Sequence, residues 1–594
     1  MAERTDPLTI TAPRPDLAAA LSAVRSGLLE VRLPLPTLGA AEAEASRTHA
    51  LAQLDDYLLP RLARLDAPVL AVIGGSTGAG KSTLANALVG QMVSRPGVLR
   101  PTTRLPVLVH HPDDAAWFGA TDKVLPGLPR VTGADGDGGG LSLRLVTASG
   151  LPAGLGLLDA PDIDSVVDAN RDLADRLLSA ADMWVFVTSA ARYADAVPWG
   201  YLRQAAARSA AVAVVLDRVS PEALDEVRAD LARMMVAEGL GDAPLFTIIE
   251  QALGPDKMLP ADAVAKLRAW LATLAGDALA RERVIRQTLA GAVSALLGDA
   301  VAIASAASRQ VSAVNVLRTD ADAAYAAAVK AVHEGSGEGS LLRGEVLARW
   351  QEFVGTGELL RNLESGVGRL RDRVAAAVTG RPRDAEVVAE AVESSLETLI
   401  LSEAEKAADD VRRSWQAQPS GRAVLAANAS LTARHDLLEP TRRLVRDWQR
   451  GVLELVRSQG SDRRTKARVL SFGVNGMGAA LMIVVFAQTA GLTGAEIGIA
   501  GGTSLVAQRL LEAVFGDQAV RALAARARDD LITAVDALLE TDLARFHDAL
   551  DALGVSSAAA TKLTVVTAAA RSAARVAQAS LAAQQEQRRR EVAT

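Results

Sequence analysis

Short apolar runs alternate with helical stretches between residues 67 and 250. Runs of this length and composition are typical of strands that are covered on both faces. Their alternation with helical stretches predicts an α/β domain with a mainly parallel sheet. The predicted strands are 69–73, 105–109, 141–146, 155–158, 184–187, 212–216 and 245–249.

The rest of the chain has a helical pattern. Residues 15–65 read as helices, and from about residue 255 apolar side chains recur at steps of three and four. Val388, Val392, Leu396 and Leu399 form one such stripe, and a second runs from Leu531 to Leu553. Stripes of this kind bury a shared seam, so the sequence predicts a long all-α bundle, or stalk, beside the α/β domain.

One segment near the C-terminus is unusually apolar. Residues 469–495 carry no charge, and after Glu496 the next charge is Arg509. A bilayer crossing needs about 20 apolar residues, so one crossing or a hairpin of two short arms fits. Basic side chains flank the segment and favour the cytoplasmic, anionic-lipid side. We therefore expect a membrane-contacting hairpin over 466–515 at the tip of the stalk, with a hairpin buried in the bundle as the alternative.

Length, charge and cysteine content limit the classes of protein to which the chain can belong. The chain has 594 residues, too many for one ordinary core, and its net charge of −6 gives no reason to expect a nucleic-acid partner. It contains no cysteine, which excludes disulfides and thiolate metal sites. Residues 1–14 have no apolar core like that of a signal peptide and are expected to be a disordered leader.

Residues 75–82, GSTGAGKS, follow the first predicted strand and match the motif G-x4-G-K-S. Glycines let successive N–H groups curl around phosphates, and the following helix adds its positive end. Lys81 is expected to reach the β- and γ-phosphates, and the Ser82 hydroxyl to bind Mg²⁺. The sequence thus predicts a P-loop nucleoside triphosphatase whose nucleotide contacts are Gly75, Ser76, Thr77, Gly78, Ala79, Gly80, Lys81, Ser82 and Thr83.

A second acidic position completes the expected magnesium site. The strand 155–158 leads into DAPDIDS, where Asp159 is placed to hold a Mg²⁺-bound water. Asp162 stands where the motif D-x-x-G has glycine. Its backbone N–H can still meet the γ-phosphate. Its carboxylate either points away from the phosphate or helps to position the attacking water.

The stretches GVLRPTTRLPVLV and LLDAPDIDSVVDANRDLADRLLSAADMWVFVTSA make residues 67–250 resemble the dynamin family. That resemblance implies that Thr103 is the switch threonine. Ser82, Thr103 and Asp159 are then expected to organise Mg²⁺, and the expected catalytic set is Lys81, Thr103, Gly78 and Asp162. The family has a serine at the position of Gly78, where it helps to place a charge-compensating cation.

The base-reading motif N/T-K-x-D aligns with Asp217, Arg218, Val219 and Ser220. Ser220 cannot supply the bidentate, charged acceptor that the family's final aspartate offers to guanine. Asp217 is a possible substitute, and weak base selection is the alternative. The expected nucleotide contacts therefore include Asp217 and Arg218, with GTP preferred over ATP.

The resemblance implies a bacterial dynamin-like GTPase on the cytoplasmic side of the membrane, with a cytosolic pool. Its expected partners are GTP, anionic lipid, and further copies of itself or a related dynamin-like chain, and its expected role is membrane remodelling in cell division or envelope maintenance. A soluble regulatory GTPase and a nucleotide-binding scaffold with little turnover are the alternatives. The expected division is a leader (1–14), N-terminal helices (15–66), a GTPase domain (67–255), a stalk (256–465), an apolar hairpin (466–515) and C-terminal helices (516–594).

Overall fold

The computed structural model describes residues 16–94, 105–119, 124–126, 128–131, 142–163, 168–207, 210–254, 256–337, 341, 345–354, 382–432, 435–459, 474–487 and 500–593. The chain forms two compact units. The first comprises residues 1–33, 38–309 and 556–594, and the second comprises 34–37 and 310–555. The 60-residue helix α10 (Ala278–Gly337) contributes residues to both. The six-part division drawn from the sequence stays a prediction.

An eight-stranded sheet forms the centre of the first unit, in the order β3-β4-β2-β5-β1-β6-β7-β8. All neighbouring strands are parallel except β2 and β5. The mainly parallel α/β fold is thus confirmed, and the short β3 is an addition to the seven predicted strands. The strands are β1 (Val69–Gly75), β2 (Val107–His110), β3 (Arg130–Val131), β4 (Leu143–Thr147), β5 (Leu155–Asp159), β6 (Met183–Ser189), β7 (Ala211–Val219) and β8 (Leu245–Ile249).

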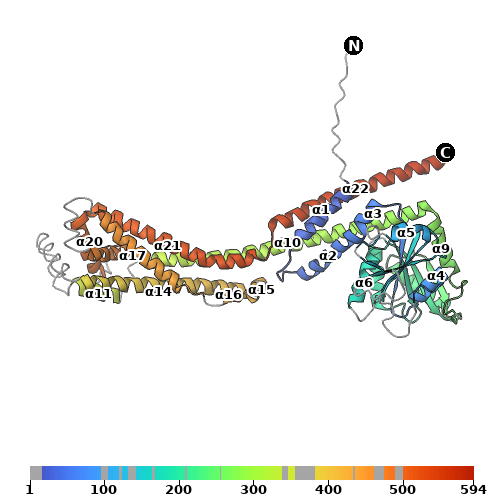
Figure 1. The fold of residues 1–594 in the computed structure, drawn as a ribbon, viewed down its shortest axis with the longest axis horizontal. Helices are drawn as coiled ribbons and strands as arrows, with labels where there is room; N and C mark the ends of the chain where they lie inside the picture. The colour runs from blue at the N-terminus through green and yellow to red at the C-terminus, as the bar shows by residue number, and fades with distance from the viewer. Residues whose placement is uncertain are drawn as a thin grey trace, which may run out of the picture. The chain divides into compact units, whose positions relative to one another are not determined.

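Helices cover both faces of this sheet (Figure 1). Every residue of β1, β5 and β6 is buried, as their unbroken apolar runs require. The covering helices are α4 (Lys81–Val89), α5 (Ala115–Phe118), α6 (Asp168–Ser179), α7 (Ala196–Ala207), α8 (Leu224–Ala237) and α9 (Ala265–Gly276).

The two ends of the chain also belong to the first unit. Asp16 begins α1 (Leu17–Glu30) by accepting a hydrogen bond from the backbone N–H of Ala18. Helix α1 lies along α22 (Ser557–Ala593), and a side chain at Gly27 would meet Leu563 at 3.3 Å (Figure 1). The close approach of these two helices therefore depends on a small residue. The remaining N-terminal helices are α2 (Ala40–Gln53), the π-helix Leu54–Leu58 and α3 (Leu59–Ala63).

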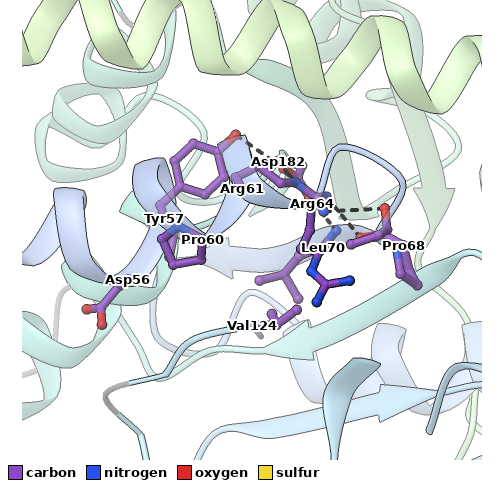
Figure 2. Close-up of a pocket in the computed structure, with 11 residues that line it drawn as sticks. Asp56, Tyr57, Pro60, Arg61, Arg64, Pro68, Leu70, Val124 and Asp182 are labelled. Atoms are coloured by element: carbon purple, nitrogen blue, oxygen red, sulfur yellow. Dashed lines mark hydrogen bonds and ion pairs between the residues drawn. The ribbon is translucent and has the colours of Figure 1, made fainter. Parts of the chain in front are cut away.

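A buried carboxylate, that of Asp182, ties these N-terminal helices to the sheet. Asp182 lies directly before β6 and is 1% exposed. Its oxygens accept hydrogen bonds from both Nε and Nη2 of Arg61, from the Tyr57 hydroxyl at 3.2 Å and from the Leu70 N–H at 2.8 Å. Figure 2 shows the Tyr57 and Arg61 side chains directed at this carboxylate. One side chain thus connects the helical layer to the beginnings of β1 and β6.

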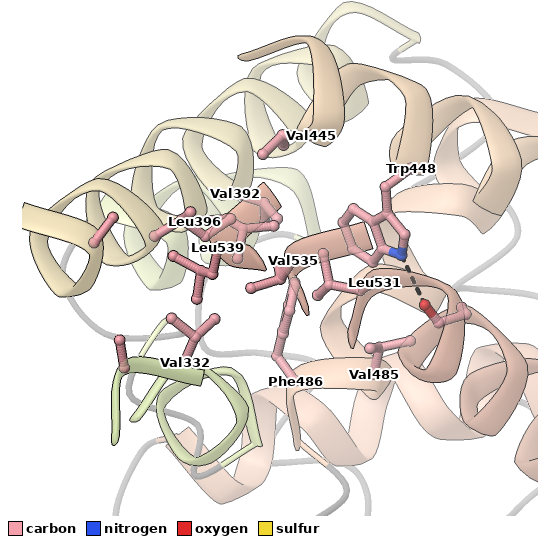
Figure 3. Packing of buried hydrophobic residues seen from close by; sticks show 14 of the residues in the cluster. Val332, Val392, Leu396, Val445, Trp448, Val485, Phe486, Leu531, Val535 and Leu539 are labelled. Atoms are coloured by element: carbon pink, nitrogen blue, oxygen red, sulfur yellow. Dashed lines mark hydrogen bonds between the residues drawn. The ribbon is translucent and has the colours of Figure 1, made fainter. Parts of the chain in front are cut away.

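The second unit is all helical. One core cluster contains the buried members of both predicted stripes, including Val392, Leu396, Val535 and Leu539 (Figure 3). Trp448 lies in this core and donates its indole N–H to the carbonyl of Ala527 at 2.7 Å. The all-α bundle is therefore confirmed. Besides α10 its helices are α11 (Glu345–Val354), α14 (Pro382–Ala417), α15 (Pro419–Ala427), α16 (Ala429–Thr432), α17 (Leu438–Gln459), α19 (Val474–Ala487), α20 (Ala500–Phe515) and α21 (Asp517–Asp551).

The apolar segment near the C-terminus supplies α19 and α20 to this bundle. Residues 476–486 of α19 are all buried, and α19 packs against α14, α17, α20 and α21. In this structure α19 is thus bundle core, the alternative that the sequence left open. Within the described part of the chain one helix, α10, is long and apolar enough to cross a membrane, and half of its apolar window is buried. The 14-residue α19 is apolar but shorter.

We predict that Asp182→Ala strongly destabilises the chain, because it removes the buried carboxylate that pairs with the Arg61 guanidinium and accepts from the Tyr57 hydroxyl and the Leu70 N–H. Breaking a buried ion pair in this way costs about 3–5 kcal/mol. Urea unfolding of the variant and the parent measures the loss. Asp55→Ala is the control, since the Arg25–Asp55 pair is 39% and 44% exposed and is worth about 1 kcal/mol or less. Equal losses of unfolding free energy in the two variants would contradict the structural role given to Asp182.

Candidate nucleotide-binding site

The P-loop joins β1 to α4 through three glycines with positive φ: Gly75 (151°), Gly78 (77°) and Gly80 (97°). A Cβ on Gly75 would lie 2.0 Å from the carbonyl oxygen of Val187, and a Cβ on Gly80 would lie 2.2 Å from the Asp217 carboxylate. Both positions therefore require glycine. Helix α4 begins at Lys81, so its positive end faces the loop.

Lys81 is buried within this loop, with 6% of its side chain exposed. Its ammonium donates hydrogen bonds to the carbonyls of Gly75 at 2.8 Å and Ser76 at 3.0 Å, and it forms an ion pair with Asp162. The Asp162 carboxylate thus points toward Lys81, and a role in positioning the attacking water stays a prediction. A phosphate that binds Lys81 competes with Asp162 for the same ammonium.

The Ser82 hydroxyl donates a hydrogen bond to Oδ2 of Asp159 at 2.7 Å. Asp159 ends β5, which pairs with β1, so the sheet brings this carboxylate to the first turn of α4. Asp159 is 1% exposed, and in the described part of the chain its Oδ1 accepts no hydrogen bond. Burial raises the pKa of Asp159, while the Ser82 and Ser94 hydroxyls and Lys81 oppose the shift.

These two side chains fit a magnesium ion. A hydroxyl and a carboxylate are hard oxygen ligands, and Mg²⁺ is commonly held by one or two such groups together with nucleotide phosphates. A cation beside Asp159 would favour its ionised form and use the oxygen that is otherwise unpaired. The third expected ligand, Thr103, lies outside the described residues.

Asp217, at the end of β7, lies against the P-loop at Gly80. Its Oδ1 accepts a hydrogen bond from the backbone N–H of Arg218 at 2.9 Å. Burial raises the pKa of Asp217 to about 6, with a smaller contribution from Glu250 in the same direction. The Ser220 hydroxyl instead accepts a hydrogen bond from the N–H of Ala223 at 3.3 Å. The structure therefore brings Asp217 to the loop and uses Ser220 in the turn before α8.

Sequence reasoning missed Arg192, which also contacts the loop. Arg192 lies in the turn between β6 and α7, and its Nη1 donates a hydrogen bond to the carbonyl of Thr77 at 2.9 Å. The position of Arg192 just after the buried strand β6 was a usable signal. The strand β6 lies beside β1, and the carboxyl ends of neighbouring parallel strands meet at one edge of a sheet.

Comparison with known proteins gives similarity at the level of structure only. No family model matches the chain, and no curated protein matches it. Two solved structures of an oligomerised bacterial dynamin pair, described as sensing and tethering membranes at long range, match over 95% and 93% of the chain and 96% and 81% of theirs. Their TM-scores are 0.37 and 0.29, at 9% and 12% identity.

The chain is similar to bacterial dynamins. A third structure, Toc33 from Arabidopsis thaliana in complex with GDP and Mg²⁺, matches 45% of this chain and 96% of its own, with a TM-score of 0.21 and 14% identity.

We predict that Asp217→Asn stabilises the nucleotide-free chain in a pH-dependent way. An aspartate in an unfolded chain has a pKa of about 3.9, and that of Asp217 in the folded chain is about 6. Below about pH 4 the carboxyl is protonated in both the folded and the unfolded chain, so it does not change the free energy of unfolding. Between about pH 4 and pH 6 the free energy of unfolding of the parent falls as the pH rises, because the group ionises more readily in the unfolded chain. A difference of two pKa units corresponds to about 3 kcal/mol, which asparagine avoids.

Urea unfolding of variant and parent at a series of pH values between 4 and 7 checks this result. Asp262→Asn, which changes an exposed carboxylate in the same unit, is the matched control. A stability difference for Asp217→Asn that stays constant across this range would contradict the prediction.

Proposed function

We propose that the chain is a Mg²⁺-dependent GTPase. One observation carries the proposal: a buried P-loop lysine and the Ser82–Asp159 pair meet at the beginning of one helix. Lys81 supplies a positive charge for phosphate oxygens, and Ser82 and Asp159 supply oxygens for the metal. This combination of groups suits a metal-bound nucleoside triphosphate.

The residues divide the work of hydrolysis as follows. Lys81 exchanges the Asp162 carboxylate for oxygens of the β- and γ-phosphates, and P-loop N–H groups bind the remaining charge. Asp162, released from Lys81, is then close to the γ-phosphate and can orient the attacking water. Magnesium would neutralise part of the phosphate charge from its place beside Ser82 and Asp159. Thr103 is proposed to close over the metal, as the resemblance to dynamins implies.

Guanine is the proposed base. Its N1–H and amino group are adjacent donors that a carboxylate can accept together, whereas adenine offers no such pair on that edge. Asp217 is the proposed acceptor, with Arg218 beside it. Because the pKa of Asp217 is about 6, its carboxylate is mostly ionised at pH 7.

Coupling of hydrolysis to self-association and to remodelling of an anionic membrane is a further part of the proposal. The dynamin resemblance of the motifs suggests it, and the basic residues that flank the apolar segment support it. Arg463, Arg464, Lys466 and Arg468 precede the segment. Such clusters bind anionic lipid at about 1 kcal/mol per residue.

We predict that Lys81→Ala abolishes GTP binding and phosphate release, because it removes the positive charge that the P-loop presents to the β- and γ-phosphates. Binding of a fluorescent GTP analogue and release of phosphate in the presence of Mg²⁺ measure the two effects. Lys266→Ala, an exposed lysine of α9, is the control. Unchanged phosphate release by Lys81→Ala would rule out this site. Equal competition by ATP and GTP would rule out guanine selection by Asp217.

We predict that the chain floats with anionic liposomes and that reversing the charges at Arg463, Arg464, Lys466 and Arg468 to glutamate abolishes flotation. Charge reversal is preferable to deletion, because removing 466–515 would take α19 out of the bundle core. Neutral liposomes are the control. If the parent chain stays in the soluble fraction with and without nucleotide, the soluble regulatory GTPase becomes the better proposal.

A further inference from the structure

The turn between β6 and α7, residues 190–195, lies directly against the P-loop. Its first residue, Ala190, donates its N–H to the carbonyl of Asp217 at 3.3 Å, and Arg192 donates its N–H to the carbonyl of Ser189 at 2.9 Å. The Arg192 side chain then extends to the carbonyl of Thr77. The turn is thus bonded to β7 and to the P-loop, so its position relative to the nucleotide site is well defined.

Strand pairing explains why an arginine in this turn reaches the loop. Gly75 pairs with Val187 in the parallel β1–β6 ladder. From that pair the P-loop leaves β1. The turn begins directly after β6 ends at Ser189, and Arg192 is its third residue. A guanidinium at 2.9 Å from the Thr77 carbonyl therefore lies at the rim of the loop that is proposed to bind the phosphates.

The contacts of Arg192 with Thr77 and Asp195 are replaceable. Its Nε also bonds to the carboxylate of Asp195 at 2.9 Å, but these side chains are 39% and 42% exposed. An exposed ion pair three residues apart is worth about 1 kcal/mol or less. A γ-phosphate offers charged oxygens to the same donors, and charged acceptors bind a guanidinium more strongly than a carbonyl does.

The chemistry of hydrolysis calls for such a group. A water oxygen forms a bond to the γ-phosphorus while the bond to the β–γ bridging oxygen breaks, and that electron pair stays on the β-phosphate. The proton of the water leaves with the released phosphate or with solvent. Negative charge thus grows on the bridging and γ-oxygens, where an arginine stabilises the transition state more than the bound substrate. Gly78 has no side chain that could help to compensate this charge.

We propose that Arg192 acts as an arginine supplied in cis: its guanidinium turns from the Thr77 carbonyl to the γ-phosphate of the bound triphosphate and stabilises the charge that develops during hydrolysis. This inference rests on the proposed GTPase function. It adds a catalytic residue that touches the reacting phosphate and that no motif of the sequence identifies.

Single-turnover hydrolysis of GTP by Arg192→Ala tests the inference. We expect a loss of about 100-fold or more, in line with arginines that act on the transition state. The affinity for GDP should change by less than about threefold, since that ligand lacks the γ-phosphate that Arg192 contacts. Arg192→Lys should keep part of the rate. Arg203→Ala is the matched control, because Arg203 lies on the following helix and pairs with Glu238 instead of the loop.

A transition-state analogue gives a second, independent readout. GDP with aluminium fluoride should bind the parent chain more tightly than GDP alone, and Arg192→Ala should lose that difference. Asp195→Ala, which removes the competing carboxylate, should keep both the rate and the analogue binding. A merely structural role for Arg192 would instead lower GDP affinity and thermal stability together.

The possible outcomes separate this inference from the proposed function. If the parent chain does not hydrolyse GTP, both fail. If the parent hydrolyses GTP and Lys81→Ala does not, but Arg192→Ala keeps the full rate and the analogue binding, the arginine assignment alone is overturned. A parallel loss of GDP binding in Arg192→Ala would also overturn it, because the residue would then act in ground-state binding.

Discussion

Parallel pairing of β5, β1, β6 and β7 places the carboxyl ends of four strands at one edge of the sheet. Each end carries a group of the candidate site: Asp159 ends β5, the P-loop follows β1, Arg192 follows β6 and Asp217 lies near the end of β7. These residues are far apart in sequence, and no local pattern connects them. Their proximity follows from strand order alone, as is general for ligand sites in open α/β sheets. A change in the order of these strands would separate the groups that the proposed chemistry needs.

Charge is the second constraint on this edge. Lys81 is buried and is stabilised there by two carbonyls and the Asp162 carboxylate. Asp159 is buried with one oxygen unpaired, and burial raises its pKa. A buried ammonium prefers an anion, and a buried carboxylate prefers a cation. A triphosphate with Mg²⁺ satisfies both preferences, which is why the geometry supports a nucleotide site more strongly than the motif does by itself.

The sequence predicted the strands and the loop because buried strands and phosphate loops have strong local signals. It did not predict Arg192, since an arginine in a polar turn carries no periodicity and becomes informative only when the strand order is known. It also could not decide how α19 is covered. A 14-residue apolar helix satisfies the composition expected of a membrane arm and of a core helix alike, and only the packing of α14, α17, α20 and α21 around it distinguishes the two. Asp162 was recognised, but its ion pair with Lys81 depends on the path of the chain after β5.

Asp182 and its hydrogen-bond partners Tyr57, Arg61 and Leu70 lie at the opposite end of these strands, and they help to fix the position of the same edge. The Asp182 carboxylate binds the N–H of Leu70 near the beginning of β1 and lies directly before β6. The strand β1 leads to Thr77 and β6 leads to Arg192. The Arg192–Thr77 hydrogen bond therefore joins the far ends of two strands whose beginnings are both fixed at Asp182. Arg61 and Tyr57 of the N-terminal helices bind the Asp182 carboxylate, and Thr288 of α10 donates its hydroxyl to the Asp182 carbonyl at 2.9 Å. Any movement of these helices that shifts β6 against β1 would therefore alter the distance between the Arg192 guanidinium and the P-loop, which gives the helices a direct physical route to the proposed chemistry.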